Sequence, residues 1–130
     1  MIDSSIFIDA SRGYPPAIQF LREAALDGEL WSVTPVRTEV RWAMRVNEIA
    51  IIQDLFERIV WMDVTTDLAD RAGDHGRRWR RSHGLSAIDS IVAAAAQELD
   101  AQVATLNVRD FPMFPGLGYD TLIWPHLGPE

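Results

Sequence analysis

Cysteine is absent from the chain of 130 residues, and lysine is absent too, because all 12 basic residues are arginine. Without cysteine there are no disulfides, no thiolate zinc sites and no cysteine nucleophile. Without lysine, a Walker-type phosphate loop, a Schiff-base enzyme and a phosphoacceptor receiver domain are all disfavoured. The fold is therefore expected to rest on packing alone.

Long apolar runs are also missing. The longest, from Ile91 to Ala96, is far too short to span a bilayer. No basic segment precedes an apolar stretch after Met1, so no signal peptide is expected. The sequence thus predicts a soluble cytoplasmic protein with no membrane partner, folded as a single domain over residues 1–130.

The net charge of −7 and the pI near 4.8 argue against a nucleic-acid partner. Two features weaken that exclusion. Carboxylates that hold a metal ion are partly neutralised by it. Arginines also gather locally, at Arg77, Arg78, Arg80 and Arg81. A solvated helix face is the alternative interpretation of this arginine cluster.

Apolar patterning predicts strands that alternate with helices. The expected strands are 2–8, 31–34, 59–64, 102–106 and 120–124, and the expected helices are 15–27, 35–46, 48–58, 66–83 and 87–99. This order is typical of βαβ units, hence of an α/β fold with a mainly parallel sheet and helices on both faces. Ligands of such sheets bind at the carboxyl ends of strands, where Asp3, Asn107 and Asp110 are expected.

Glu39 is an acidic residue on the apolar face of its expected helix. In segment 35–46, Glu39 falls on the side of the valines, opposite to Arg37, Arg41 and Arg45. A bare carboxylate is costly there unless something pairs with it. The alternatives are a ligand role and an ion pair with an arginine of the same helix.

Two further acids lie among apolar neighbours. Asp89 is on the buried side of an alanine-rich helix, but it also stands three residues after Ser86, where a capping box is the alternative. Asp3 follows an apolar residue at a strand end, where a turn residue is the alternative. Three such acids would repel one another without a cation between them. Oxygen ligands without Cys or His predict Mg²⁺ or Mn²⁺.

The four segments that hold these residues resemble the motifs of PIN-domain nucleases, above all the VapC toxins of bacterial toxin–antitoxin pairs. They are 2–9 (IDSSIFID), 34–40 (TPVRTEV), 85–96 (LSAIDSIVAAAA) and 105–111 (TLNVRDF), in the family's order. The resemblance implies a three-layer PIN-like fold, a metal-dependent endoribonuclease, a homodimer and a cognate VapB-like antitoxin.

The resemblance also assigns roles to single residues. It implies that Asp3, Glu39 and Asp89 hold the metal and, with Asp110, form the catalytic set. Asn107 stands at the fourth acidic position without a charge, and whether it or Asp110 completes the site stays open. Ser5 is expected to orient Asp3 or to contact phosphate, a strand-end cap being the alternative.

Three functions follow as hypotheses. The first is Mg²⁺- or Mn²⁺-dependent hydrolysis of RNA phosphodiester bonds by a toxin. The second is a catalytically weak or inactive binding module on the same fold, and the third is a small hydrolase of another phosphoester. The arginine cluster is then a candidate contact for RNA or an acidic antitoxin segment. Trp42, on the less apolar flank of its helix, is the best candidate for contact with a protein partner.

Overall fold

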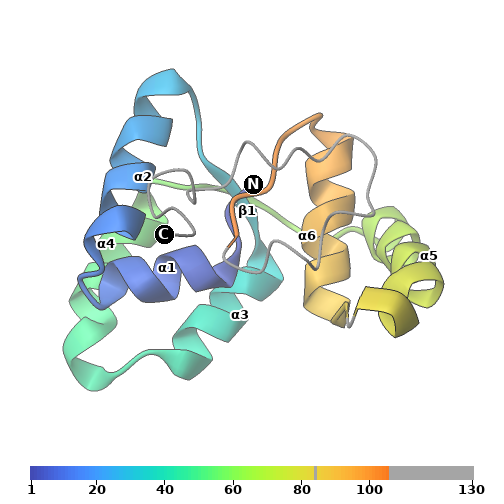
Figure 1. Cartoon of the computed structure of the whole chain (residues 1–130), viewed down its shortest axis with the longest axis horizontal. Coiled ribbons are helices and arrows are strands. Elements are labelled where there is room, and N and C mark those ends of the chain that lie inside the picture. The colour runs from blue at the N-terminus through green and yellow to red at the C-terminus, as the bar shows by residue number, and fades with distance from the viewer. Residues whose placement is uncertain (84, 106–130) are drawn as a thin grey trace.

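The computed structural model describes residues 1–83 and 85–105. Within them, helices α1 to α4 gather on one side of the strands, while α6, with α5 outside it, lies on the other (Figure 1). The predicted α/β architecture is therefore confirmed. The elements in chain order are α1 (Ser4–Ser11), α2 (Pro15–Asp27), β1 (Trp31–Val33), α3 (Thr34–Ala43), η1 (Val46–Glu48), α4 (Ile49–Glu57), β2 (Val60–Met62), α5 (Thr66–His83) and α6 (Ala87–Glu98).

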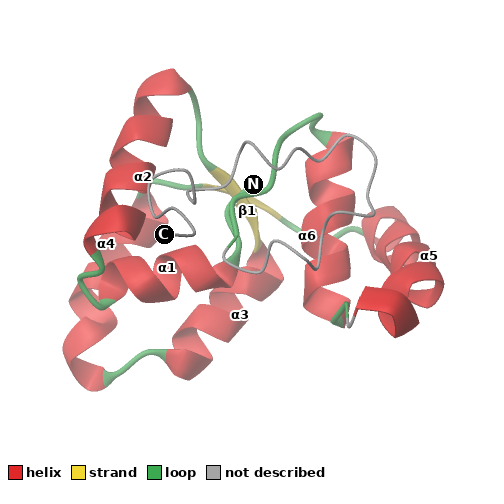
Figure 2. Cartoon of the chain, viewed as in Figure 1, coloured by secondary structure: helices red, strands yellow, loops and turns green. Residues whose placement is uncertain are grey.

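The strands lie parallel at the centre of the molecule (Figure 2). β1 pairs with β2, so that Trp31 stands opposite Val60. The chain start extends this sheet, because the Ile2 N–H donates to the Trp31 carbonyl oxygen at 2.8 Å. Ile2 also forms a parallel bridge with Ala104. The N-terminal segment consequently lies between β1 and a segment about a hundred residues later in the sequence.

The strand predicted over 2–8 is wrong. Only Ile2 joins the sheet, and α1 begins at Ser4. The buried residues Ile6, Phe7 and Ala10 are spaced as one face of a helix. The β-branched side chain of Ile6 and the aromatic ring of Phe7 favour a strand locally, but burial of this face against other helices outweighs that preference. The short strand leaves Asp3 at the junction between the sheet and α1.

Other boundaries agree with the sequence to differing degrees. α2 and α5 span the predicted residues, and α6 begins after its Ser86 cap as expected. α3 ends at Ala43, before the predicted 46, and η1 precedes α4. The fourth strand is reduced to the bridge at Ala104 within its described part. The predicted end of that strand and the strand 120–124 lie outside the described residues.

Three aromatic rings form the core between α1, α4 and β2. Phe7 and Trp61 stack at 5.8 Å between ring centroids, and Phe56 meets both rings edge-on. The Arg37 guanidinium lies over the rings of Phe56 and Trp61, at 4.6 and 4.7 Å from their centroids. Arg37 therefore covers these rings with its planar cation, whereas Arg41, the other arginine of α3, is exposed.

None of the helices in the described ranges combines the length and the apolar character that a transmembrane span requires.

Candidate active site

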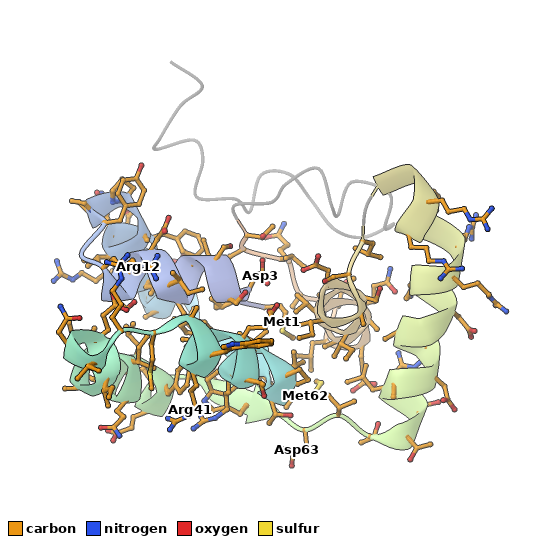
Figure 3. All side chains as sticks on the ribbon, turned by 90° about the horizontal axis from the view of Figure 1, so that it is seen from below. Met1, Asp3, Arg12, Arg41, Met62 and Asp63 are labelled. Carbon is orange, nitrogen blue, oxygen red and sulfur yellow. The ribbon has the colours of Figure 1, made fainter. Side chains whose placement is uncertain are left out.

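Asp3 stands where the central strand segment ends and α1 begins. It is 1% exposed, and it lies between the α1–α3 side of the molecule and α6 (Figure 3). Its Oδ2 accepts hydrogen bonds from Thr105 Oγ1 at 2.6 Å and from Ser5 Oγ at 3.3 Å. Its Oδ1 is buried and has no hydrogen-bond partner among the described residues. One carboxylate oxygen is thus held by the protein while the other remains available.

Glu39 reaches the same region from α3. Its Oε1 is likewise buried without a hydrogen-bond partner among the described residues. None of the ion pairs within residues 1–83 and 85–105 involves Glu39, so the alternative of a salt bridge to an arginine of its own helix is not seen there. The Ser4 side chain stands beside Glu39 and lowers the pKa of that carboxyl against the effect of burial. Glu39 is therefore half-buried, with one buried carboxylate oxygen that no described protein group satisfies.

Asp89 forms the capping box that the sequence offered as the alternative to a ligand role. Its N–H donates to Ser86 Oγ at 3.1 Å, and the Ser86 N–H donates to Asp89 Oδ2 at 3.4 Å, which completes a capping box at the start of α6. The Asp89 charge also raises the pKa of Asp3 and of Glu39. Helix capping fixes Asp89 at the first turn of α6, where it faces the other two acids.

The three acids form one electrostatic cluster. Burial raises the pKa of Asp3 to about 6; the Thr105 hydrogen bond opposes this shift, and the charges of Asp89 and Glu39 add to it. Burial likewise raises the pKa of Glu39, with the Asp89 charge acting in the same direction. The three acids therefore lie within electrostatic reach of one another, while their expected role as joint metal ligands stays a prediction.

The residues present fit a hard divalent cation in their chemistry. The buried Asp3 Oδ1 and Glu39 Oε1 have no hydrogen-bond partner in the part of the chain that the structure describes, and carboxylate oxygens are the donors that Mg²⁺ and Mn²⁺ prefer. No group of three or more His, Cys, Asp or Glu side chains within the described ranges is arranged closely enough to hold one ion. The repulsion and the two unsatisfied oxygens identify the cluster, whereas joint ligation by all three acids stays a proposal.

The remaining predicted site residues differ in what the structure says of them. Ser5 contacts Asp3, as one of its two expected roles requires. Asn107 and Asp110 lie outside the described residues. Arg77, Arg78, Arg80 and Arg81 are exposed on α5. Trp42 is 87% exposed at the end of α3.

Sequence reasoning gave no role to Thr105 and Ser4. Thr105 donates a hydrogen bond to Asp3, and the Ser4 side chain stands beside Glu39, where it lowers the pKa of that carboxyl. Ser4 carried a weak signal, as a hydroxyl next to an acid at a strand end. Thr105 carried only its position at the end of the late strand segment, whose alignment beside Ile2 could not be derived from local pattern.

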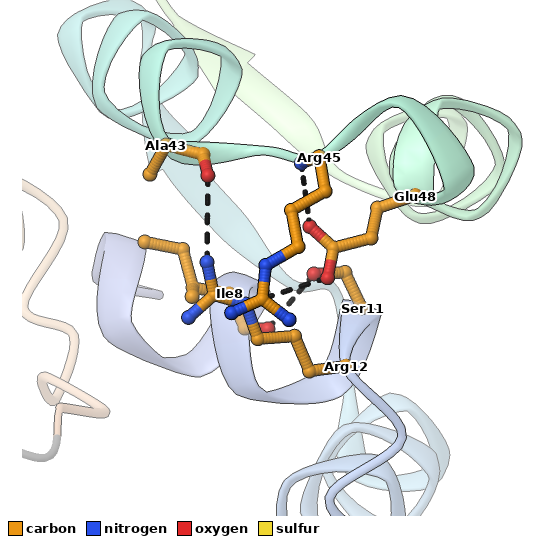
Figure 4. Close-up of polar contacts among 6 residues, drawn as sticks. All are labelled: Ile8, Ser11, Arg12, Ala43, Arg45 and Glu48. Carbon is orange, nitrogen blue, oxygen red and sulfur yellow. Dashed lines mark hydrogen bonds and ion pairs between the residues drawn. The ribbon is translucent and has the colours of Figure 1, made fainter.

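A second polar contact holds α1 against the α3–α4 connection (Figure 4). Glu48 is buried, and it accepts from the Arg45 N–H at 2.7 Å and from Arg12 Nε at 3.3 Å. Arg12 also donates to the Ala43 carbonyl oxygen at 3.4 Å. Arg12 therefore links the end of α1 to the end of α3. Asp3 directly precedes α1, and Glu39 lies within α3.

Known proteins resemble this chain in sequence and in fold. A family model of the PIN domain matches residues 1–114. The chain is 40% identical over 119 residues to Ribonuclease VapC19 of Mycobacterium tuberculosis, covering 90% of this chain and 95% of that protein. It is 37% identical over 118 residues to Ribonuclease VapC10 of the same organism, covering 90% and 89%. A solved toxin-antitoxin complex from Klebsiella pneumoniae shares the fold, with a TM-score of 0.69 at 23% identity over 90% of this chain and 93% of the matched one.

Proposed function

The chain belongs to the PIN-domain family, and we propose that it is an endoribonuclease of the VapC toxin type that hydrolyses RNA phosphodiester bonds. One observation carries the proposal: three carboxylates from separate elements repel one another beside the sheet, and two of them bury an unsatisfied oxygen. The relatives named Ribonuclease VapC19 and Ribonuclease VapC10 supply the substrate class.

Asp3, Glu39 and Asp89 would hold Mg²⁺ or Mn²⁺, and Asp110 or Asn107 would complete the site. A bound divalent ion in such a site activates water and neutralises charge on the reacting phosphate. Thr105 and Ser5 occupy Asp3 Oδ2, so that Oδ1 is the oxygen left for the ion. The Ser4 side chain beside Glu39 favours the ionised form of this carboxylate.

Repulsion within the cluster gives the metal a second role. Because burial and the neighbouring acids raise the pKa of Asp3 to about 6, the ionised cluster is unfavourable by itself. A divalent cation offsets that repulsion and favours the ionised carboxylates. Metal binding is therefore expected to release protons near neutral pH and to stabilise the fold.

We also propose a cognate VapB-like antitoxin as protein partner, and a homodimer as the assembly. The solved relative from Klebsiella pneumoniae is a toxin-antitoxin complex, which supports the antitoxin. Exposed apolar side chains at the α3–α4 connection, among them Trp42 and Val46, each 87% exposed, support burial against a second chain.

Cleavage of a mixed-sequence RNA tests the proposed activity. The purified chain is compared with D3A and D89A at rising Mg²⁺ or Mn²⁺, and calorimetric Mn²⁺ titration is run on each protein. D54A is the matched control, because the Asp54 side chain is 62% exposed and pairs only with Arg58 in the described structure. We expect cleavage and Mn²⁺ binding by the wild type and D54A, and loss of both in D3A and D89A.

Each rival has its own signature in this experiment. Equal cleavage by wild type, D3A and D89A rejects the metal-nuclease proposal. RNA binding without cleavage at any metal concentration indicates the binding module. Hydrolysis of a small phosphoester without cleavage of RNA indicates the third hypothesis.

A further inference from the structure

A groove runs between α5 and α6, on the side of α6 that faces away from the sheet. Its volume is about 480 Å³, and its walls include Gly73, Gly76, Arg77, Arg80, Leu85 and Ala87. Ser90 lies at its floor, where a Cβ added to Gly76 would come within 3.0 Å of Ser90 Oγ. The helices thus approach closely, and the two arginines are the charged groups that line the groove.

The charge of α5 is divided along its length. Its first half holds Asp67, Asp70 and Asp74, whereas residues 77–81 include four arginines and no acid. Arg71 is engaged by Asp67 and Glu98 and is not free for another partner. One cation in the last turn is enough to complement the helix dipole. Four arginines there are more than the stability of the helix requires. In a chain of net charge −7, this local excess of positive charge indicates an anionic partner.

Both arginines of the groove are accessible to such a partner. Arg77 pairs with Asp74 at 3.2 Å, with side-chain exposures of 77% and 72%, and an ion pair this exposed is weak and exchangeable. Arg80 is exposed and forms no ion pair with any described residue. Guanidinium groups are planar forks that match phosphate oxygens, so the two arginines suit the phosphate backbone of a nucleic acid.

The groove ends beside the acidic cluster. Leu85 and Ala87 line it on either side of the Ser86 cap, and Asp89 follows in the first turn of the same helix. A helix with its side chains is about 10–12 Å across, so the groove and the cluster lie within about one helix diameter of each other at the start of α6. A strand that reaches from the groove to the cluster has to cross the first turn of α6.

We propose that Arg77 and Arg80 bind the phosphodiester backbone of the single-stranded RNA beside the bond to be cleaved. This inference rests on the proposed function and adds the subsite that holds the substrate strand. The binding is electrostatic and independent of base sequence, because Ser90 is the one other polar side chain among the described residues that line the groove.

The test measures binding separately from cleavage. A fluorescently labelled single-stranded RNA is titrated with protein in EDTA, and fluorescence anisotropy is recorded from low to high salt. R77A/R80A is compared with R22A/R58A, a double variant with the same charge change that alters the other groove, between α1, α2 and α4. Circular dichroism checks that both variants are folded.

We expect the wild type and R22A/R58A to bind alike, and R77A/R80A to bind at least 10-fold more weakly. The slope of log K against log salt should fall by about 1.4 in R77A/R80A, since each contact to a single strand contributes about 0.7. R77K/R80K, which keeps both charges, should recover most of the affinity. With metal present, R77A/R80A should raise KM and leave kcat at saturating RNA unchanged.

Several results would overturn the subsite. Equal affinity and equal salt slope for R77A/R80A and wild type reject it, while RNA cleavage by both leaves the proposed function intact. Equal loss in both double variants shows a general charge effect and also rejects it. If R77A/R80A keeps its RNA affinity but no longer binds an antitoxin, the groove is a protein interface. Absence of RNA binding and cleavage in the wild type instead rejects the proposed function itself.

Discussion

Thr105 donates a 2.6 Å hydrogen bond to Asp3 Oδ2, which joins two fully buried side chains 102 positions apart in the sequence. The main chain reinforces this link, because the Asp3 N–H donates to the Ala104 carbonyl oxygen at 3.0 Å. Asp3 is therefore oriented by the late strand segment as much as by its own neighbours in α1.

Replacing Thr105 with valine should weaken metal binding. T105V keeps the shape of the side chain but removes the donor to Asp3, so the pKa of Asp3 should rise further and its Oδ2 should lose its anchor. Calorimetric Mn²⁺ titration near pH 7 should show an affinity loss of roughly 10-fold or more, as for other residues that orient ligands. T105S retains the hydroxyl and should bind like wild type; equal affinity of all three proteins would contradict the role.

The metal-free protein should lose stability as pH rises through the titration of Asp3. The pKa of Asp3 lies at about 6 in the folded chain against an ordinary value of 3.8. The folded state therefore holds a proton that the unfolded state has released, and this contribution is present in full below about pH 4 and lost by about pH 6 to 7. A shift of about two units corresponds to ~3 kcal/mol.

D3N isolates this contribution. Its amide carries no charge and still accepts from Thr105, so its advantage over the wild type in urea unfolding should grow from pH 4 to 6.5 and then level off. Saturating Mg²⁺ should reverse the order at pH 7.5, because D3N loses a ligand. A constant difference between the two proteins across this range would show that Asp3 does not titrate as described.

Arg12 and Glu48 should contribute more to stability than an exposed ion pair does. Glu48 is buried with Arg12 and the Arg45 N–H as partners, whereas Arg58 and Asp54 are both more than half exposed. R12A leaves a buried carboxylate with one partner fewer, so urea unfolding should show a loss of about 1–3 kcal/mol. R58A should cost less than about 1 kcal/mol. Equal losses for R12A and R58A would contradict a special role for the buried contact.

Trp42 should lie in the proposed dimer interface. At 87% exposure its indole is open to solvent in the single chain, and Val46, equally exposed, lies close by in sequence. W42E should shift sedimentation from dimer to monomer, and wild-type tryptophan fluorescence should move to longer wavelength on dilution. L26E, at a residue equally exposed on α2, is the control and should leave the assembly unchanged. A wild type that sediments as a monomer rejects the dimer.

Much of the fold could be read from the sequence because its strongest signals are local. The paired prolines at the start of α2, the Ser86 cap and the polar length of α5 each marked a boundary that the structure confirms. The segment 2–8 was misjudged because Ile6 and Phe7 satisfy a strand locally. The position of Phe7 is decided by contact with Phe56 and Trp61, about fifty residues away in sequence.

The acids of the site can be predicted from the sequence because a charged residue on an apolar face is unusual. Glu39 and Asp89 stood out by helical periodicity, and Asp3 by its place at a strand end. The hydroxyls that orient them did not, because serine and threonine are unremarkable at either a buried or an exposed position. The burial of Glu48 cannot be predicted from local sequence either, since its partner Arg12, at the end of α1, is 36 residues away in sequence.

The pairing of residue 3 with residues 104 and 105 also constrains when the protein can acquire its site during synthesis. A nascent polypeptide presents Asp3 at the ribosome exit long before Thr105 has been translated. Contacts between such remote positions form late in folding, because a long loop must first close. A prematurely terminated product that lacks this segment leaves Asp3 without its anchor, so residue 105 must be translated before the carboxylates can be organised.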